Sequence, residues 1–502
     1  MKKYLSIMFA FLMSIVTIGS VNAKMSGPFT ITIDPATKGH IYEAYQIFDG
    51  DVSNAGTTEA NDKILSNIKW GEGIDSSFTN LTAKKYAEIL SGNDSNSDEI
   101  IAATRELSKH LITSKAKTGE YDETTGKYTI NINSDKAGYY LVRDKKETLD
   151  GTTQDMGTGY IVKLVDNITV QPKKSFPTPT KVIDENNGVK ATANYAFGEE
   201  VPFKLTGSLP TNYDFFDNYK YTFHDTLDNG LEFNENSVEV YVGNTKIVSG
   251  YDIDTTETAD HTFAIIFNDT KSEDIKDAED KTVTITKDSV ITIKYKAKVK
   301  NDAVRGLPGN ENKMFIEYSN NPGTNNTGKT KEVNTKVYVF NLEFNKIRSD
   351  GGTALTGAQF IIERKNADNW EAVEGIEYTV TENGTVFTFS GLSNGTYRVT
   401  ETTTPDGYNT IKPFEFTIKA NYNDSDTTKL ESLDIVSTET SEVATIEVKD
   451  SEFSTLKTTV TNIKGITLPL TGGMGTIIFT VLGSILMGIA TIFLIKSKKE
   501  NN

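Results

Sequence analysis

Apolar and polar residues alternate one by one through most of the chain, which is the pattern of strands with one buried face. β-branched and aromatic residues carry the alternation, and Gly, Asn, Asp and Pro bound each run. The clearest runs cover 29–33, 128–133, 281–300, 336–347 and 385–401. Helical spacing of apolar residues appears at 82–91 and 97–114. The pattern therefore predicts a mainly β protein whose helices are confined to its first third.

The same pattern predicts three domains. Residues 24–173 combine strands with both helices, whereas 174–336 and 337–467 each have the strand pattern of an all-β sandwich. The first seam contains QPKKSFPTPTK, whose prolines favour a stiff, extended linker. The second seam follows a polar loop over 319–335.

The two ends of the chain are apolar. Residues 1–23 have a short basic region, an apolar run and small residues before Ala23, which is typical of a secretory signal peptide cleaved after Ala23. This run is too short for a membrane anchor to be the better interpretation. A second apolar segment at 475–495 has about 20 residues, enough for a transmembrane helix. A basic tail at 496–499 then predicts that the end stays cytoplasmic and that the domains lie outside the cell.

Composition excludes several function classes. The 502 residues include no cysteine, so disulfides cannot stabilise this exported chain. The net charge of −17, without a basic patch, argues against a nucleic-acid partner. The run Asp94, Asn96, Asp98 lacks the Gly and Glu of a calcium loop, so a solvated loop is the better interpretation. The four histidines are scattered in the sequence, and we expect no metal, no cofactor and no enzyme active site.

Three polar residues of the last domain have the parity of the apolar residues on their strands. They are Lys346 in NLEFNKI, Glu401 in GTYRVTET and Asn462 in TVTNIKG. Because side chains alternate between the faces of a strand, all three should point into the core. Burying each one unpaired would cost several kcal/mol.

The middle domain repeats this arrangement. Lys181 shares parity with Ile183 on the first strand, Asp225 shares parity with the apolar residues of YTFHDTL, and Asn312 with those of NKMFIEY. Asn310 has the same parity and is a rival to Asn312. The middle and last domains thus each offer an early Lys, a central acid and a late Asn.

A Lys–Asn amide cross-link would account for these sets. Burial should lower the Lys pKa and raise that of the acid, so that both can be neutral. The acid would hydrogen-bond the Asn carbonyl and relay protons while the amine attacks and ammonia leaves. The fold would supply the proximity that such a reaction needs. A buried salt bridge beside a hydrogen-bonded Asn explains the parity equally well.

At these residues the sequence resembles a known family. YRVTETTTPDGY is similar to the E-box of Gram-positive pilins, and NKIRSDGGTALTGAQF resembles the opening of collagen-adhesin B-type domains. HDTLDNGLEF, NKMFIEYSNNP and GHIYEAYQIFDGD are similar to segments of sortase-assembled backbone pilins. The resemblance implies tandem Ig-like or collagen-adhesin-type sandwiches, with isopeptide bonds Lys346–Asn462 and Lys181–Asn312 formed autocatalytically through Glu401 and Asp225. We find no such set in the first domain.

The sequence LPLTG at 468–472, followed by the apolar span and basic tail, resembles a sortase sorting signal made of Leu468, Pro469, Leu470, Thr471 and Gly472. The resemblance implies that a sortase forms an acyl-enzyme on the Thr471 carbonyl.

The acyl-enzyme needs an amine. In this family the amine is the Lys of the motif Trp-x-x-x-Val-x-Val-Tyr-Pro-Lys, which aligns with residues 164–173. The resemblance therefore implies Lys173, with Lys174 as the second choice, although Leu164 and Gln171 replace the Trp and Tyr of the motif.

The resemblance therefore predicts the shaft subunit of a cell-wall-anchored surface pilus. Its partners would be a pilin sortase, copies of itself, minor pilins, peptidoglycan and host surface or matrix proteins. The alternative is a monomeric wall-anchored adhesin or a basal pilin attached through LPLTG. A wall-active enzyme is more distant, because no nucleophile–base pair is evident.

Overall fold

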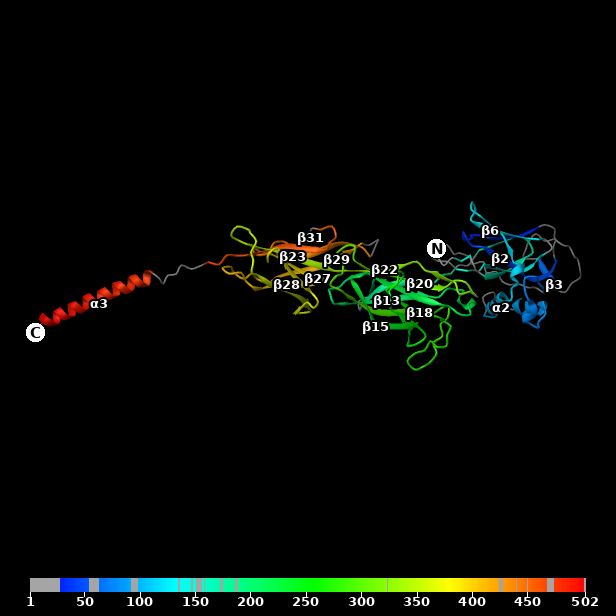
Figure 1. The fold of residues 1–502 in the computed structure, drawn as a ribbon, viewed down its shortest axis with the longest axis horizontal. Coiled ribbons are helices and arrows are strands. Elements are labelled where there is room, and N and C mark those ends of the chain that lie inside the picture. Colours follow the sequence, from blue (N-terminus) through cyan, green and yellow to red (C-terminus); the bar gives the residue numbers. More distant parts are fainter. Residues whose placement is uncertain are drawn as a thin grey trace.

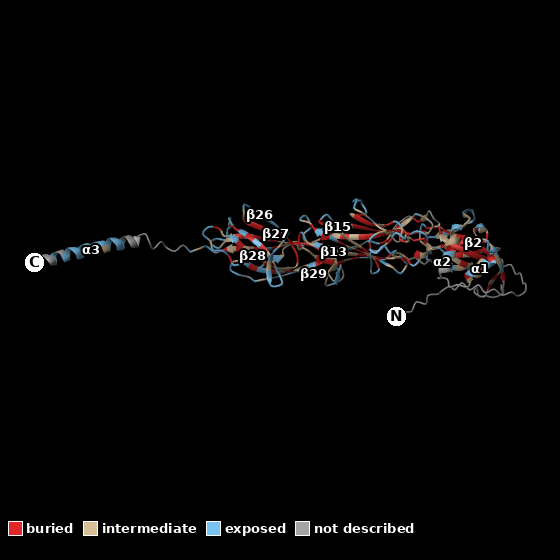
Figure 2. Ribbon diagram, turned by 90° about the horizontal axis from the view of Figure 1, so that it is seen from below, coloured by how far each residue is buried: buried red, intermediate tan, exposed pale blue. Residues whose placement is uncertain are grey.

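The structure is a computed structural model, and it describes residues 28–53, 63–91, 98–133, 136–145, 148–149, 156–157, 159–171, 175–185, 188–322, 324–423, 428–438, 440–448, 450–466 and 474–500. Figure 1 shows three β-rich bodies placed end to end, with a single helix at the far end of the chain. The buried residues gather within each body, and the final helix stands apart from all three (Figure 2).

The first body contains two sheets and two helices. One sheet has the order β5-β6-β1-β9 and the other β3-β2-β7-β8, with β4 beside β2. Apolar residues from both sheets and from the helices form its core. The elements are β1 (Phe29–Ile33), β2 (Tyr42–Ser53), β3 (Ile64–Trp70), α1 (Ala83–Ser91), α2 (Asp98–Lys109), β4 (Lys117–Thr118), β5 (Glu120–Asp122), β6 (Lys127–Ile132), β7 (Gly138–Asp144), β8 (Gly159–Leu164) and β9 (Ile168–Val170).

The second body is a sandwich of two sheets, ordered β11-β10-β13-β19-β15-β16 and β12-β22-β20-β14-β18-β17, with β21 beside β20. Its strands are β10 (Pro179–Glu185), β11 (Gly188–Lys190), β12 (Thr192–Asn194), β13 (Glu200–Ser208), β14 (Tyr221–Leu227), β15 (Leu231–Val242), β16 (Thr245–Ile247), β17 (Asp252–Asp254), β18 (Phe263–Phe267), β19 (Val290–Val299), β20 (Asn310–Ser319), β21 (Thr327–Lys329) and β22 (Val333–Tyr338). Buried and less buried residues alternate along β13 and β19, as expected for strands that cover one side of a core.

The third body is a second sandwich, with sheets ordered β26-β27-β23-β32-β31 and β25-β24-β28-β29-β30. Its strands are β23 (Phe340–Arg348), β24 (Gln359–Asn366), β25 (Asn369–Ala372), β26 (Glu377–Thr381), β27 (Val386–Leu392), β28 (Gly395–Thr403), β29 (Phe414–Tyr422), β30 (Leu430–Ser437), β31 (Glu447–Val448) and β32 (Thr455–Asn462). Val339 alone separates β22 from β23, so the chain passes from one sandwich to the next without a linker.

Side-chain and backbone contacts also join neighbouring bodies. Arg364 in the third body forms an ion pair of 2.9 Å with Glu199 in the second, and the Phe197 amide donates to the Gly391 carbonyl. Between the first and second bodies, Lys109 of α2 lies 3.1 Å from Asp217. These contacts hold the bodies in a row.

The sequence-predicted elements are mostly present, with two corrections. The predicted strand over 281–300 is wrong in its first half, because Thr286 and Ser289 bond to each other in a turn and the strand begins at Val290. The predicted helix over 97–114 ends at Lys109, because the Ile112 amide turns away to bond the Gly73 carbonyl.

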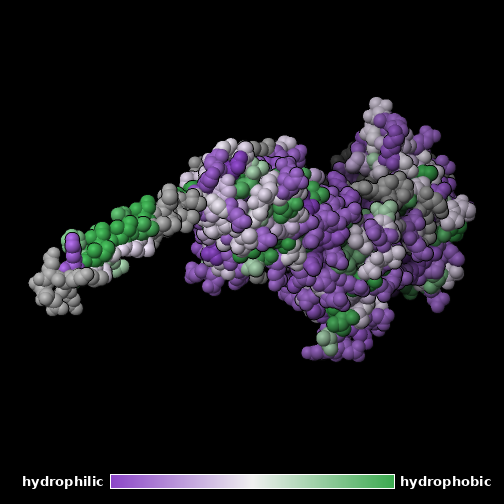
Figure 3. Space-filling view, turned by 60° about the vertical axis from the view of Figure 1, so that its left-hand side comes forward, coloured by the Kyte–Doolittle hydropathy of each residue, from purple (hydrophilic) through white to green (hydrophobic). Residues whose placement is uncertain are grey.

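The last helix, α3 (Met474–Glu500), carries large apolar side chains on its exposed surface, such as Phe479 and Leu486. This surface stands out from the largely hydrophilic surface of the β-rich bodies (Figure 3). Among the residues that the structure describes, no helix is long and apolar enough to cross a membrane. The transmembrane span over 475–495 therefore remains a prediction from the sequence.

Candidate functional site

The polar set of the last sandwich lies between its two sheets. β23 and β32 are parallel neighbours, and Lys346 is in register with Val460, so Asn462 lies two residues further along β32. Lys346 and Asn462 are fully buried, as the alternation on their strands predicts. Glu401 enters the same space from β28 in the facing sheet and is 4% exposed. The fold thus brings together three polar side chains that are distant in sequence.

Glu401 contacts both of the other side chains. Nζ of Lys346 lies 3.5 Å from Oε1 of Glu401. Nδ2 of Asn462 donates a hydrogen bond of 3.0 Å to Oε2 of Glu401 and one of 2.7 Å to the Asn409 carbonyl. The Ile411 amide also donates to Oε2, at 3.0 Å, and helps to fix the carboxylate.

This site contains polar atoms whose hydrogen-bonding capacity is unused. Nζ of Lys346, Oε1 of Glu401 and Oδ1 of Asn462 have no hydrogen-bond partner within the described residues. Burial lowers the pKa of Lys346 to about 8, and the charge of Glu401 opposes this shift only in part. The amine is therefore closer to its neutral, nucleophilic form than a surface lysine is. Leaving such groups buried and separate is costly.

The orientation of Asn462 differs from the sequence-based expectation that the acid hydrogen-bonds the Asn carbonyl. The backbone carbonyl of Asn409 can only accept, so it holds the amide nitrogen, and that nitrogen also faces Glu401. The acid therefore contacts the nitrogen that would depart as ammonia.

The middle sandwich has a similar arrangement. Lys181 on β10 donates a hydrogen bond to Oδ2 of Asp225 on β14, and Asn312 lies on β20, next to β14. Lys181 is 5% exposed, and Asp225 and Asn312 are fully buried. Burial lowers the pKa of Lys181 to about 8 and raises the pKa of Asp225, so both groups shift toward their neutral forms. Oδ1 of Asn312 has no hydrogen-bond partner in the described part of the chain.

Asn310 has a different role from Asn312. Its Oδ1 accepts from the Val304 amide, and its Nδ2 donates to the carbonyls of Val304 and Val337. The side chain is fully buried and fixes the loop before β20. These bonds occupy the Asn310 amide, so Asn312 is the Asn that faces the Lys181 site.

Sequence reasoning missed Tyr295, whose hydroxyl joins the middle set. It lies on β19, in the same sheet as Lys181, and contacts Lys181, Asp225 and Asn312. Tyr295 has the parity of Ile291, Ile293 and Ala297, so its sequence pattern is that of an ordinary core aromatic.

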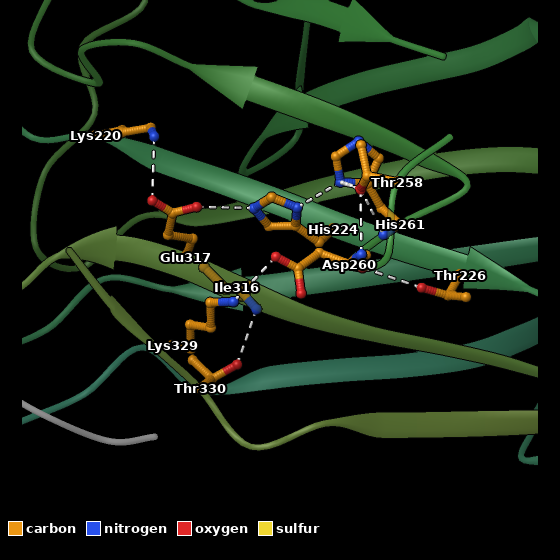
Figure 4. A network of polar contacts seen from close by, with 10 residues as sticks. All are labelled: Lys220, His224, Thr226, Thr258, Asp260, His261, Ile316, Glu317, Lys329 and Thr330. Carbon is orange, nitrogen blue, oxygen red and sulfur yellow. Dashed lines mark hydrogen bonds and ion pairs between the residues drawn. The ribbon is translucent and has the colours of Figure 1, made fainter. Parts of the chain in front are cut away.

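A second polar cluster lies on the other side of β14 (Figure 4). Nδ1 of His224 lies 2.8 Å from Nδ1 of His261, and Nε2 of His224 lies 3.1 Å from Glu317. Glu317 also pairs with Lys220 at 3.1 Å. Two of the histidines that are scattered in sequence are therefore neighbours in space, but within the described ranges no group of three or more His, Asp or Glu side chains could hold a metal ion.

Several sequence-predicted sites lie outside the described residues. They are the cleavage site at Ala23, the loop residues Asp94 and Asn96, the linker lysines Lys173 and Lys174, and the sorting motif 468–472. In the first body, buried Lys63 pairs at 2.6 Å with Asp166, whose side chain is 40% exposed, so this pair differs from the two enclosed sets.

Comparisons with known proteins agree with this architecture. The model of the SpaA prealbumin-like fold domain matches residues 340–432, and the model of the LPXTG cell wall anchor motif matches residues 461–502. The chain is 27% identical over 395 residues to the trypsin-resistant surface T6 protein of Streptococcus pyogenes serotype M6, an alignment that covers 65% of this chain and 70% of that protein.

Among solved structures, the T6 backbone pilin of S. pyogenes serotype M6 is similar in fold, with a TM-score of 0.52 and 18% identity over 88% of this chain and 100% of that chain. The full-length major pilin SpaD of Corynebacterium diphtheriae has a TM-score of 0.48 and 17% identity, over 89% of this chain and 99% of that one. The T6 relative is a backbone pilin, a structural protein rather than an enzyme. The chain is thus a homologue of the T6 protein, with a backbone-pilin fold and an LPXTG motif that anchors it to a Gram-positive cell wall.

Proposed function

We propose that this chain is the shaft subunit of a covalent surface pilus, cross-linked internally by Lys346–Asn462 and Lys181–Asn312 amide bonds and joined head to tail by a sortase. The observation that carries the proposal is the enclosed set of Lys346, Glu401 and Asn462, in which one carboxyl contacts both a buried amine and a carboxamide. The cell wall anchor motif and the homology to the T6 protein support the surface location.

The internal reaction needs only groups of this chain. The neutral Lys346 amine attacks Cγ of Asn462, so that the Nζ–Cγ bond forms and the Cγ–Nδ2 bond breaks. Glu401 gives a proton to Nδ2 and takes one from Nζ, and ammonia leaves while the acid is regenerated. The fold supplies the proximity, worth about 7–11 kcal/mol.

The product amide is uncharged, which removes the cost of burying a separate amine. It also closes a loop of more than 100 residues. In the loop-entropy model of disulfides, such a closure stabilises the fold by about 4–5 kcal/mol. Two such bonds take the place of disulfides in a chain that has no cysteine.

Polymerisation would use two groups that are far apart in the chain, the Thr471 carbonyl and a linker lysine. A sortase cleaves after Thr471, and its acyl group passes to the amine of Lys173, or of Lys174, in the next subunit. Both lysines belong to the segment between β9 and β10, at the junction of the first and second bodies. Because the two surfaces differ, the contact is head to tail and gives an open filament. Minor pilins, peptidoglycan and host surface or matrix proteins are the further partners of such a filament.

A wall-anchored monomeric adhesin or basal pilin is the competing function, and a cell-wall extract distinguishes it. The double variant Lys173→Ala, Lys174→Ala should lose the high-mass ladder but keep the monomer attached to the wall. Lys190→Ala, which removes an exposed lysine of β11, is the matched control and should keep the ladder. A wild-type extract that contains only monomer would support the competing function, and a ladder that persists in the double variant would show that another amine accepts the acyl group.

A further inference from the structure

The hydroxyl of Tyr295 lies at the centre of the middle-domain set. Nδ2 of Asn312 donates to it at 2.6 Å, Nζ of Lys181 donates to it at 3.2 Å, and it donates to Oδ1 of Asp225 at 3.1 Å. Tyr295 is 2% exposed, so these bonds are screened from water. Its hydroxyl is therefore within reach of the nucleophile, the acid and the leaving group of the proposed cross-link.

The two cross-link sites differ at this point. In the last domain, Glu401 contacts the Asn462 amide nitrogen directly, at 3.0 Å. In the middle domain the acid is Asp225, whose side chain is one methylene shorter, and the Asn312 nitrogen bonds Tyr295 instead. The tyrosine hydroxyl occupies the position between acid and amide that the longer glutamate spans by itself.

We propose that Tyr295 is a catalytic residue of the Lys181–Asn312 cross-link and carries a proton from Asp225 to the departing nitrogen of Asn312. This inference rests on the proposed function, since it assigns a role within the internal cross-linking reaction.

The proton transfers balance. Nζ of Lys181 forms a bond to Cγ of Asn312 and gives one proton to Oδ2 of Asp225. The protonated Asp225 gives its own proton from Oδ1 to the Tyr295 hydroxyl, which passes its original proton to Nδ2. The Cγ–Nδ2 bond breaks and ammonia leaves, while Asp225 and Tyr295 return to their starting protonation states. The relay requires the Tyr295–Asp225 hydrogen bond to reverse its direction during the reaction.

The aromatic ring alone has a structural role that can be separated from that of the hydroxyl. The ring stacks on Phe203 at a centroid distance of 5.3 Å and contacts Phe233 and Phe263 edge to face. Phenylalanine would keep these contacts. Tyr295→Phe therefore removes the relay and leaves most of the packing.

The test follows cross-link formation in the full ectodomain by intact mass and peptide mapping, at fixed times after cell-free synthesis. Tyr295→Phe should slow formation of the Lys181–Asn312 bond by about 100-fold or more, the lower range for a positioned proton donor. The Lys346–Asn462 bond in the same molecule should form at the normal rate and serves as the internal control. Asp225→Glu in the Tyr295→Phe background should restore the bond, because the longer acid can reach Asn312 as Glu401 reaches Asn462.

The outcomes separate this inference from the proposed function. A Lys181–Asn312 bond that forms at the wild-type rate in Tyr295→Phe overturns the role of Tyr295 and leaves the cross-link itself standing. A wild-type chain without that bond overturns the cross-link in the middle domain. In the double variant, a Lys181–Asn312 bond supports the relay, and a folded chain without the bond contradicts it.

Discussion

Lys346 and Asn462 lie on neighbouring parallel strands, and Asn462 is two residues past the register partner of Lys346. This offset suits a long side chain that reaches forward along the sheet toward a short one. The two strands are the first and the last of the third body, so a covalent bond between them would close the whole sandwich. Glu401, from the facing sheet, contacts the Lys346 amine at this point.

Removing the acid should prevent the bond in the last domain. In Glu401→Ala, the proton relay is lost and the Lys346 amine stays buried without its partner. The ectodomain should therefore retain one ammonia that the wild type loses, and its mass should be higher by that amount, apart from the substitution itself. Thermal unfolding should show a loss of about 4–5 kcal/mol in that domain, the value of the closed loop. Glu363→Ala is the control, because Glu363 pairs with Arg398 at the domain surface. It should keep the bond and cost about 1 kcal/mol or less, and a bond that still forms in Glu401→Ala would refute the role of the acid.

A chain that cannot form the bond should become more stable at high pH. Burial lowers the pKa of Lys346 to about 8 in the folded chain, from about 10.5 for an unfolded lysine, and Asn462→Ala keeps this amine free to titrate. Between these values the unfolded state binds more protons, so the free energy of unfolding should rise with pH, by about 3 kcal/mol in all. Below pH 8 Lys346 is protonated in both the folded and the unfolded state, so its contribution to the free energy of unfolding no longer changes with pH. Urea titrations at pH 8 and pH 10.5 measure this rise, which the wild type should lack because its amine is an amide. The same rise in unfolding free energy in both proteins would contradict a bond at Lys346.

The His224 cluster should make the middle domain sensitive to acid. The hydrogen bond from His224 lowers the pKa of Glu317 to about 2, from an ordinary value of 4.5. The stability it contributes is therefore present above pH 4.5 and is lost as the pH falls toward 2. Glu317→Gln should cost about 1 kcal/mol at pH 7, because water screens this partly exposed pair. Its unfolding free energy should depend less on pH than that of the wild type between 4.5 and 2, and an unchanged slope would argue against this assignment.

The junction between the second and third bodies should depend on Phe197. This ring is 1% exposed, lies against Gly391, and is covered by the Arg305 guanidinium at 4.9 Å. Phe197→Ala should cost about 3–5 kcal/mol by leaving a cavity, and limited proteolysis should cut the chain near the junction. Tyr378→Ala, which truncates an exposed aromatic residue of β26, should leave the junction resistant. Equal resistance in both variants would show that Phe197 does not hold the bodies together.

Strand parity made the buried polar residues predictable. The side-chain period of two is a local property of the chain, so Lys346, Asp225 and Asn312 could be placed inside without knowing the fold. The same rule could not separate Asn310 from Asn312, because both share one face and only the tertiary contacts of Asn310 distinguish them.

Features that depend on distant contacts were not predictable. Tyr295 and the pairing of His224 with His261 arise where separate strands meet, and no local pattern marks them. The prediction of a strand over 281–289 was wrong because a turn that is fixed by a side-chain hydrogen bond overrides a favourable β pattern. The linker lysines and the sorting motif lie outside the described residues, so their roles rest on the sequence.

The central claim is that the enclosed lysines are joined covalently to asparagine, and the intact mass of the purified ectodomain tests it most directly. The account predicts a mass lower than the sequence value by two ammonia molecules, with peptide mapping that assigns one loss to Lys346–Asn462 and the other to Lys181–Asn312. A mass equal to the sequence value, with all four side chains recovered in unlinked peptides, would contradict it.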